Sequence, residues 1–297
     1  MLYERLEKCP VCGKSSFRNK LVVEDKSVSQ ESFAIVQCEA CTFQFTNPRP
    51  DAQGIGRYYE SEAYVSHNST ATGVINQVYR LARMFTMRRK VSLLNHLSPR
   101  RGKLLDYGCG TGHFLAAAKR KGWQVAGYEP NDRAREEATR RVGQPVGSES
   151  LSTFEAGSFD AITLWHVLEH VHTLNETLDQ LISLLKPDGV LIIAVPNVES
   201  FDAQHYQQHW AAYDVPRHLY HFSPKTMALL LKKHKLQLRK TLPMPLDAYY
   251  VSMLSEKHQS GKGKGMLSVL RTGYASNQYA ADNENQYSSL IYVAGRR

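Results

Sequence analysis

Apolar runs of strand length alternate with amphipathic segments through most of the chain. An apolar run at residues 104–106 precedes a helical composition at 114–121, and a helical stretch at 175–185 precedes an apolar run at 190–195. Strands that alternate with helices are typical of a doubly wound α/β fold, in which helices cover both faces of a mostly parallel sheet. We expect seven strands, at residues 104–106, 124–129, 142–147, 158–165, 190–195, 236–242 and 289–294.

Prolines at positions 48 and 50 mark a boundary between two domains. The sequence Asn47-Pro-Arg-Pro-Asp51 cannot continue regular structure, because each proline removes a backbone donor and restricts its neighbour. We expect a small domain at residues 1–50, a linker and helical cap at 51–100, and the α/β core at 101–297. The core carries an insertion at 243–288 that is too long for a hairpin, and inserted segments of this size usually have a function.

Four of the five cysteines form two Cys-x-x-Cys pairs, Cys9 with Cys12 and Cys38 with Cys41, and 25 residues separate the pairs. This spacing is typical of tetrahedral zinc, and the strand-like alternation at 33–37 between the pairs resembles a zinc ribbon. Four thiolates leave no open coordination position, so the metal is expected to be structural. An iron–sulfur cluster or a redox dithiol are the alternatives, but neither pair lies in a strand–helix redox context.

The chain has 297 residues, of which 42% are hydrophobic, and this is enough for one large and one small domain. No apolar run approaches the ~20 residues that a membrane span needs. Residues 1–8 are charged and lack the apolar region of a signal peptide. We therefore expect a cytoplasmic protein without a membrane span.

The net charge of +9 is concentrated in one segment, because residues 63–105 contain eight basic and no acidic side chains. The basic residues are Arg80, Arg83, Arg88, Arg89, Lys90, Arg100, Arg101 and Lys103. Such a face attracts an anionic substrate, nucleic acid or an acidic lipid surface, or it is simply the solvated side of a helix. The segment lacks the interleaved aromatic residues of a single-strand platform, so nucleic acid is the least expected partner.

A glycine-rich turn follows the first strand of the core, in the sequence Asp-Tyr-Gly-Cys-Gly-Thr-Gly at 106–112. Its glycines permit backbone torsions closed to other residues, and the free N–H groups of the following helix can receive a negative group. A dinucleotide-binding turn needs Gly-x-Gly-x-x-Gly, but its third glycine is replaced here by His113. The spacing therefore argues against NAD.

The spacing Asp-x-Gly-x-Gly-x-Gly resembles the first motif of class I S-adenosylmethionine-dependent methyltransferases. It is carried by Asp106, Gly108, Gly110 and Gly112, with Cys109 inside the turn. In that family the turn wraps the methionine end of the cofactor, and an acid that closes the next strand holds the ribose hydroxyls. Glu129, 23 residues after Asp106, is the acid at that place. The resemblance implies S-adenosylmethionine as the cofactor and a last strand that runs antiparallel.

The strand at 158–165 leads directly into His166-Val-Leu-Glu169-His170. The spacing matches the inverted zinc-protease motif, but that motif needs a long helix and a remote third ligand, whereas here the carboxyl end of a buried strand precedes it. The stretch also resembles the Val-Leu-Glu-His segment of ubiquinone-pathway O-methyltransferases. That resemblance implies that Trp165 and His166 lie beside the cofactor, and Glu169 and His170 near the acceptor.

The loop after the fifth strand, residues 205–224, contains four histidines, which titrate near neutral pH. One histidine would more often be structural, but four beside the ligand-binding edge of a sheet leave a structural and a catalytic role equally open. The piece around His218 is similar to the acceptor loop of zinc-containing sugar C-methyltransferases, which also carry an N-terminal four-cysteine domain. Those enzymes usually have Glu before the histidine, where this chain has Arg217.

We expect methyl transfer to the oxygen or carbon of a small-molecule acceptor, with an anionic acceptor if the basic face takes part. His218 is the expected general base, because its loop reaches the ligand-binding edge. The other candidates are His170, His166, Glu169 and His221, with Tyr213 in an orienting role. The insertion at 243–288 is expected to close over the acceptor. The alternative is a nucleic-acid-binding protein or nucleic-acid methyltransferase that uses the ribbon and the basic helix, although the Asn-Pro-Pro-Tyr motif of base methylation is absent.

Overall fold

A computed structural model describes residues 3–59, 74–148, 151–261 and 265–296, and it describes the side chains of the long helix α2 (Val74–Leu97) from Met84 onward. Residues 60–73 of the predicted linker and the side chains of Arg80 and Arg83 lie outside the described residues. Among the described residues, no helix combines the length and the apolar composition that crossing a bilayer requires.

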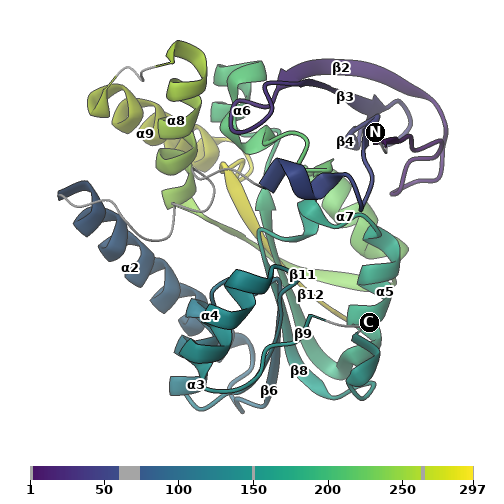
Figure 1. Cartoon of the computed structure of the whole chain (residues 1–297), viewed down its shortest axis with the longest axis vertical. Coiled ribbons are helices and arrows are strands. Elements are labelled where there is room, and N and C mark those ends of the chain that lie inside the picture. Colours follow the sequence, from purple (N-terminus) through teal and green to yellow (C-terminus); the bar gives the residue numbers. More distant parts are fainter. Residues whose placement is uncertain (1–2, 60–73, 149–150, 262–264, 297) are drawn as a thin grey trace.

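A six-stranded sheet with the order β11-β12-β9-β8-β6-β7 forms the centre of the molecule, and β12 alone runs against its neighbours (Figure 1). The strands are β6 (Lys103–Tyr107), β7 (Gln124–Tyr128), β8 (Phe159–Trp165), β9 (Leu185–Pro196), β11 (Leu236–Pro243) and β12 (Ser289–Arg296). The predicted doubly wound fold, with an antiparallel last strand, is confirmed.

The remaining predicted strand, at 142–147, is reduced to a single parallel bridge between Tyr128 and Gly147. Helix α4 (Asp132–Val142) extends into this range and ends at Gly143, whose φ of 69° closes the helix in the left-handed conformation. Only residues 144–147 are left for pairing beside β7, so the edge of the sheet carries a bridge instead of a strand.

Helices cover both faces of the sheet (Figure 1). One face is covered by α2, α3 (His113–Arg120) and α4, and the other by α5 (Leu174–Leu184) and α7 (Pro224–Lys233). Adjacent strand residues point to opposite faces, so Leu104 packs beneath the first group of helices and Leu105 beneath the second. The carboxyl ends of the parallel strands meet at one edge, where we look for the site.

The cysteine-containing segment forms an antiparallel sheet of β2 (Phe17–Glu24), β3 (Ser32–Cys38) and β4 (Gln44–Thr46). A fourth strand, β10 (Tyr220–His221), comes from the loop after β9 and pairs with β4. A two-stranded ladder of β1 (Tyr3–Glu4) and β5 (Arg49–Pro50) completes the segment. The ribbon and the histidine-rich loop of the core therefore belong to one sheet.

The insertion between β11 and β12 folds into two helices, α8 (Pro245–Ser260) and α9 (Met266–Asp282). They lie at the same end of the central sheet as the ribbon and α6 (Phe201–Tyr206) (Figure 1). The remaining short helices are η1 (Ile55–Tyr59), η2 (Leu151–Thr153), η3 (Leu168–His170), η4 (Gln207–His209) and η5 (Ala211–Tyr213). The ribbon, the insertion and the histidine-rich loop thus surround the carboxyl edge of the sheet.

Candidate functional site

The glycine turn connects β6 to α3 and has positive φ values at all three glycines, 74° at Gly108, 53° at Gly110 and 74° at Gly112. A Cβ on Gly108 would lie 2.5 Å from Val167 Cγ2, and a Cβ on Gly112 would lie 2.9 Å from Ala138 Cα. A Cβ on Gly110 would meet no atom within 4 Å. Packing therefore requires the outer glycines, whereas the backbone at Gly110 is open to an approaching ligand.

Two carboxylates, Asp106 and Glu129, flank this turn. Glu129 is buried at the end of β7 and accepts hydrogen bonds from the backbone N–H groups of Gly110, at 2.8 Å, and Asn131, at 3.0 Å, one on each carboxylate oxygen. Asp106 is also buried and accepts a hydrogen bond of 2.6 Å from Thr163 Oγ1, and burial raises its pKa to about 7. Each Glu129 oxygen can still accept a second hydrogen bond.

Cys109 lies within the turn and is buried, and burial raises the pKa of its thiol. A thiol with a raised pKa is a poor nucleophile. Cys109 is therefore suited to a packing role, as a small side chain within the turn, and not to that of a nucleophile.

Trp165 and His166 lie at the carboxyl end of β8. The Trp165 ring packs edge-on against Phe114, with centroids 5.4 Å apart, and its buried Nε1 has no hydrogen-bond partner among the described residues. His166 Nε2 lies 3.2 Å from Asp247 Oδ2, and His166 Nδ1 lies 3.5 Å from Glu169 Oε1. Burial opposes a charge on His166, but these two carboxylates outweigh it and raise its pKa to about 9. His166 is therefore a cation at neutral pH.

Glu169, His170 and His218 form a buried cluster next to this pair. Apart from the ion-pair contact with His166, the carboxylate oxygens of Glu169 have no hydrogen-bond partner in the described part of the chain, and the rings of His170 and His218 are 4.5 Å apart. His218 Nδ1 donates to the carbonyl of Ala212 at 2.8 Å, which leaves Nε2 with a lone pair. The three residues offer ligand atoms within 4.8 Å of one another, so they could hold a metal ion.

His221 and Tyr213 lie on the side of the cluster that faces the ribbon. His221 Nε2 is 3.1 Å from the hydroxyl of Thr46 on β4, and the rings of Tyr213 and His221 are 5.4 Å apart. Burial lowers the pKa of His221 to about 3 and raises that of Tyr213 to about 12. The structure therefore brings His218 together with His166, Glu169 and His170, whereas His221 contacts Tyr213 and Thr46 of the ribbon, and Tyr213 also packs against Trp210.

Arg217 connects the histidine-rich loop to the ribbon through buried ion pairs. Its Nη2 lies 2.8 Å from Asp25 Oδ1 and 2.6 Å from Asp214 Oδ1, and its Nη1 donates to the carbonyl of Tyr58 at 2.9 Å. The side chains of Arg217 and Asp25 are 1% and 0% exposed, so removing Arg217 would leave the Asp25 carboxylate buried without its ion-pair partner. Arg217, which stands where the sugar C-methyltransferases usually have Glu, thus fixes the position of the neighbouring His218.

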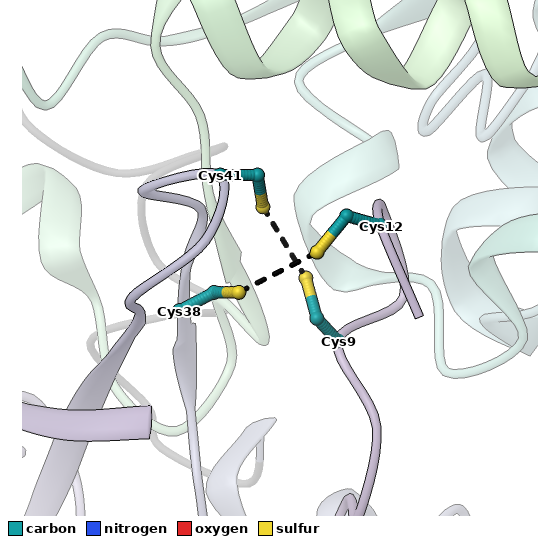
Figure 2. A group of neighbouring side chains, drawn as sticks. All are labelled: Cys9, Cys12, Cys38 and Cys41. Atoms are coloured by element: carbon teal, nitrogen blue, oxygen red, sulfur yellow. Dashed lines mark hydrogen bonds between the residues drawn. The ribbon is translucent and has the colours of Figure 1, made fainter. Parts of the chain in front are cut away.

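The four ribbon cysteines point toward one another from two loops (Figure 2). The Sγ atoms of Cys9 and Cys41 are 3.6 Å apart, and those of Cys12 and Cys38 are 3.5 Å apart. Tetrahedral zinc with Zn–S bonds of ~2.3 Å separates its sulfurs by about 3.8 Å, which is close to these values. Burial raises the pKa of the Cys41 thiol to about 11, and a divalent cation would compensate the thiolate charge. The tetrad fits a structural zinc ion.

The family profile described as "Methyltransferase domain" matches residues 79–241, more than half of the chain. The chain belongs to the methyltransferase domain family. It is similar to the ubiquinone biosynthesis O-methyltransferases of Albidiferax ferrireducens, with 30% identity over 118 residues, and of Xanthomonas axonopodis pv. citri, with 36% identity over 112 residues. These alignments cover 36% and 34% of this chain and 47% and 46% of the relatives. This methyltransferase thus spans about half the length of the curated relatives it matches.

Solved methyltransferase structures share the fold. Magnesium protoporphyrin IX methyltransferase from Synechocystis PCC 6803 is 14% identical with a TM-score of 0.54, and the match covers 82% of this chain and 100% of that chain. Geranyl diphosphate C-methyltransferase from Streptomyces coelicolor A3(2) is 16% identical with a TM-score of 0.51, and the match covers 80% and 87%. At these identities, the likeness concerns the fold alone.

Sequence reasoning missed two charged residues at this site of the methyltransferase, Lys90 and Asp247. Lys90 Nζ lies 4.3 Å from the centroid of the Trp165 ring, and Asp247 holds His166. A signal for Lys90 was present, because it lies three residues after Met87 and four before Leu94, within the apolar stripe of its helix. No local sequence pattern linked Asp247 to the site, since it lies in the insertion, far along the chain from His166.

Proposed function

We propose that this methyltransferase transfers a methyl group from S-adenosylmethionine to a small-molecule acceptor. When bound, the cofactor supplies an electrophilic methyl group on a sulfonium. The observation that carries the proposal is the open backbone at Gly110 beside Glu129, since a Cβ at Gly110 would meet nothing within 4 Å. The free capacity of the Glu129 oxygens suits a pair of vicinal hydroxyls, as the ribose of the cofactor presents. Asp106, Trp165 and His166 would complete the cofactor site.

The general base in this proposal is His218. Burial lowers the pKa of His221 to about 3, and burial together with His218 lowers that of His170 to about 4, so both are weak proton acceptors. His166 is already a cation because its pKa is raised to about 9. His218 keeps a lone pair on Nε2, and Asp214 Oδ2 lies 4.0 Å from that atom, where it can stabilise the imidazolium that proton transfer creates.

The ribbon, residues 1–50, contributes a structural zinc ion to this proposal, and residues 51–100 connect it to the core at 101–297. The helical insertion within 243–288 lies at the carboxyl edge of the sheet and serves as a lid over the acceptor. Two relatives of this chain, at 30% and 36% identity, are named as O-methyltransferases of ubiquinone biosynthesis. We therefore propose that this chain methylates an oxygen or carbon atom of an acceptor of low molecular mass.

Calorimetric titration with S-adenosylhomocysteine tests the cofactor, and incubation of a metabolite extract with methyl-labelled S-adenosylmethionine tests the transfer. We expect binding of one cofactor per chain and label in a compound of low molecular mass. Absence of binding, or tight binding of NAD in its place, would overturn the proposal. Label found only in nucleic acid would assign the protein to the alternative class.

A further inference from the structure

A pocket of about 170 Å³ lies between α2 and the start of α8. Its lining is contributed by α2, the end of β11, the start of β12 and the first residues of the insertion. Most of these side chains are apolar, and they include Leu93, Leu242, Met244, Leu246 and Ile291. A cavity of about 150 Å³ is large enough for benzene, so the pocket has room for one ring-sized apolar group.

This pocket adjoins the proposed methyl-transfer site through two of its polar lining residues. Asp247 lines the pocket and lies 3.2 Å from Nε2 of His166. Lys90 lines it too, with Nζ 4.3 Å from the centroid of the Trp165 ring. Because Trp165 and His166 are the residues placed beside the cofactor, a molecule in the pocket lies next to the reacting methyl group in the proposed function.

Lys90 has no carboxylate within ion-pair distance in the part of the chain that the structure describes. Asp247, its neighbour across the pocket, is paired with His166. Burial lowers the pKa of Lys90. The negative charges of Asp247 and Asp106, which lie beyond ion-pair distance, act in the opposite direction but do not offset this shift. The ammonium group thus faces an apolar pocket without the counter-charge that a partly buried cation requires.

We propose that this pocket is the acceptor subsite, and that it takes a compact apolar molecule with an anionic substituent, which pairs with Lys90. This inference rests on the proposed methyl transfer. Two molecules carry an anionic group that suits Lys90: the acceptor, and the cofactor, whose methionine part has a carboxylate. We assign the anionic group to the acceptor, because Lys90 shares the pocket with apolar side chains that match the body of a separate molecule.

Calorimetric titration of the cofactor-loaded protein with three probes tests the proposal. Benzoate carries both the ring and the charge, benzamide carries the ring alone, and acetate carries the charge alone. With saturating S-adenosylhomocysteine, we expect benzoate to bind at least tenfold more tightly than either benzamide or acetate. Lys90→Met should remove the preference for benzoate over benzamide while S-adenosylhomocysteine affinity stays within about twofold.

The matched control is Arg88→Met, which removes a cation from the same helix at an exposed position that does not line the pocket. This variant should retain the preference for benzoate. Lys90→Gln, judged by circular dichroism to be folded, provides a second test if Lys90→Met is unstable.

Equal affinity of the wild-type protein for benzoate and benzamide would overturn the subsite. So would a Lys90→Met variant that keeps the preference but loses tenfold or more in S-adenosylhomocysteine affinity, because the amine would then serve the cofactor. Failure of the wild-type protein to bind S-adenosylhomocysteine would instead overturn the methyl-transfer proposal. The two failures are thereby distinguishable.

Discussion

The two halves of the candidate site are built in different ways. The cofactor half is built mostly from one stretch of chain between Asp106 and Glu129, which uses backbone N–H groups and glycines, and Trp165 and His166 are proposed to complete it. The acceptor half is assembled from distant segments: Thr46 and His218 are 172 residues apart in the sequence, and Asp25 and Arg217 are 192 apart. Unfolding of the ribbon should therefore lower acceptor turnover first and leave cofactor affinity nearly unchanged.

Removing the metal ligand Cys12 should give the largest effect. Structural zinc contributes about 10–16 kcal/mol in isolated fingers, so Cys12→Ser should unfold the ribbon and abolish transfer to the acceptor. S-adenosylhomocysteine affinity should change only a few-fold, because Gly110 and Glu129 belong to the other half. Elemental analysis measures the zinc content, calorimetry the S-adenosylhomocysteine affinity, and a labelled-methyl assay the transfer to the acceptor.

The control for this experiment is Cys109→Ser, which should keep one zinc ion per chain because Cys109 lies in the glycine turn. Wild-type protein that was purified under reducing conditions and contains no zinc would contradict the ribbon assignment. Equal losses of cofactor affinity and acceptor turnover in Cys12→Ser would contradict the division into halves.

Replacing the proposed base should lower the rate without affecting the cofactor. His218→Asn is expected to reduce turnover by roughly 10²- to 10⁴-fold, as loss of general-base catalysis does, with unchanged S-adenosylhomocysteine affinity. His205→Asn, at an exposed histidine of the same loop, is the matched control and should keep full activity.

Two results would contradict the role of His218. The first is full activity of His218→Asn together with loss of activity in His170→Asn. The second is a second metal equivalent in the wild-type protein that disappears in His218→Asn, because it would make His218 a ligand beside Glu169 and His170.

Breaking the buried ion pair that anchors the histidine-rich loop to the ribbon should destabilise the protein. Arg217→Met leaves Asp25 buried without its partner, which costs about 3–5 kcal/mol in the free energy of unfolding. Urea denaturation measures this cost, and the acceptor's Michaelis constant should rise more than S-adenosylhomocysteine affinity falls. Arg140→Met removes an ion pair with Glu136 in which the side chains are 71% and 70% exposed, and it should cost below about 1 kcal/mol. Equal costs for the two variants would refute the anchoring role of Arg217.

The smallest expected effect concerns the cofactor half itself. Glu129→Ala removes hydrogen bonds to a charged acceptor, each worth about 1.5–3 kcal/mol, so S-adenosylhomocysteine affinity should fall by at least roughly tenfold. The ribbon should keep its zinc ion, and the free energy of unfolding of the ribbon should not change. Glu137→Ala, on the partly exposed side of α4, is the control for loss of a carboxylate. An unchanged affinity in Glu129→Ala would defeat the ribose assignment.

The cofactor half could be predicted from the sequence because its determinants are local. Glycine spacing, an acid at a strand end and apolar runs specify a strand, a turn and a helix without knowledge of distant contacts. The predicted fifth strand, 190–195, is shorter than β9, which also includes Lys186-Pro-Asp-Gly189. The register between β8 and β9 shifts from Phe159↔Leu185 to Ala161↔Val190, so residues 186–189 form an irregularity at the start of the strand.

The acceptor half could be predicted only in part. The histidines were identified as a cluster along the chain, but Glu169, His170 and His218 meet because the loop that carries His218 packs on η3, where the Leu219 N–H donates to the Glu169 carbonyl at 2.7 Å. Lys90 and Asp247 face one pocket across 157 residues of sequence, which is the difference between their positions. Such contacts depend on tertiary packing, which overrides local signals.

The pairing of β10 with β4 also affects the synthesis of the protein on the ribosome. A chain that grows by about 5–20 residues per second reaches His218 roughly 9–35 s after Thr46, because 172 residues separate them. During that interval the four cysteines can already bind their metal ion, but β4 presents an unpaired edge. An unpaired edge is a template for association with other chains. A nascent ribbon that binds the proposed zinc ion would therefore be metal-loaded and unfinished at the same time, and the late arrival of β10 completes its sheet.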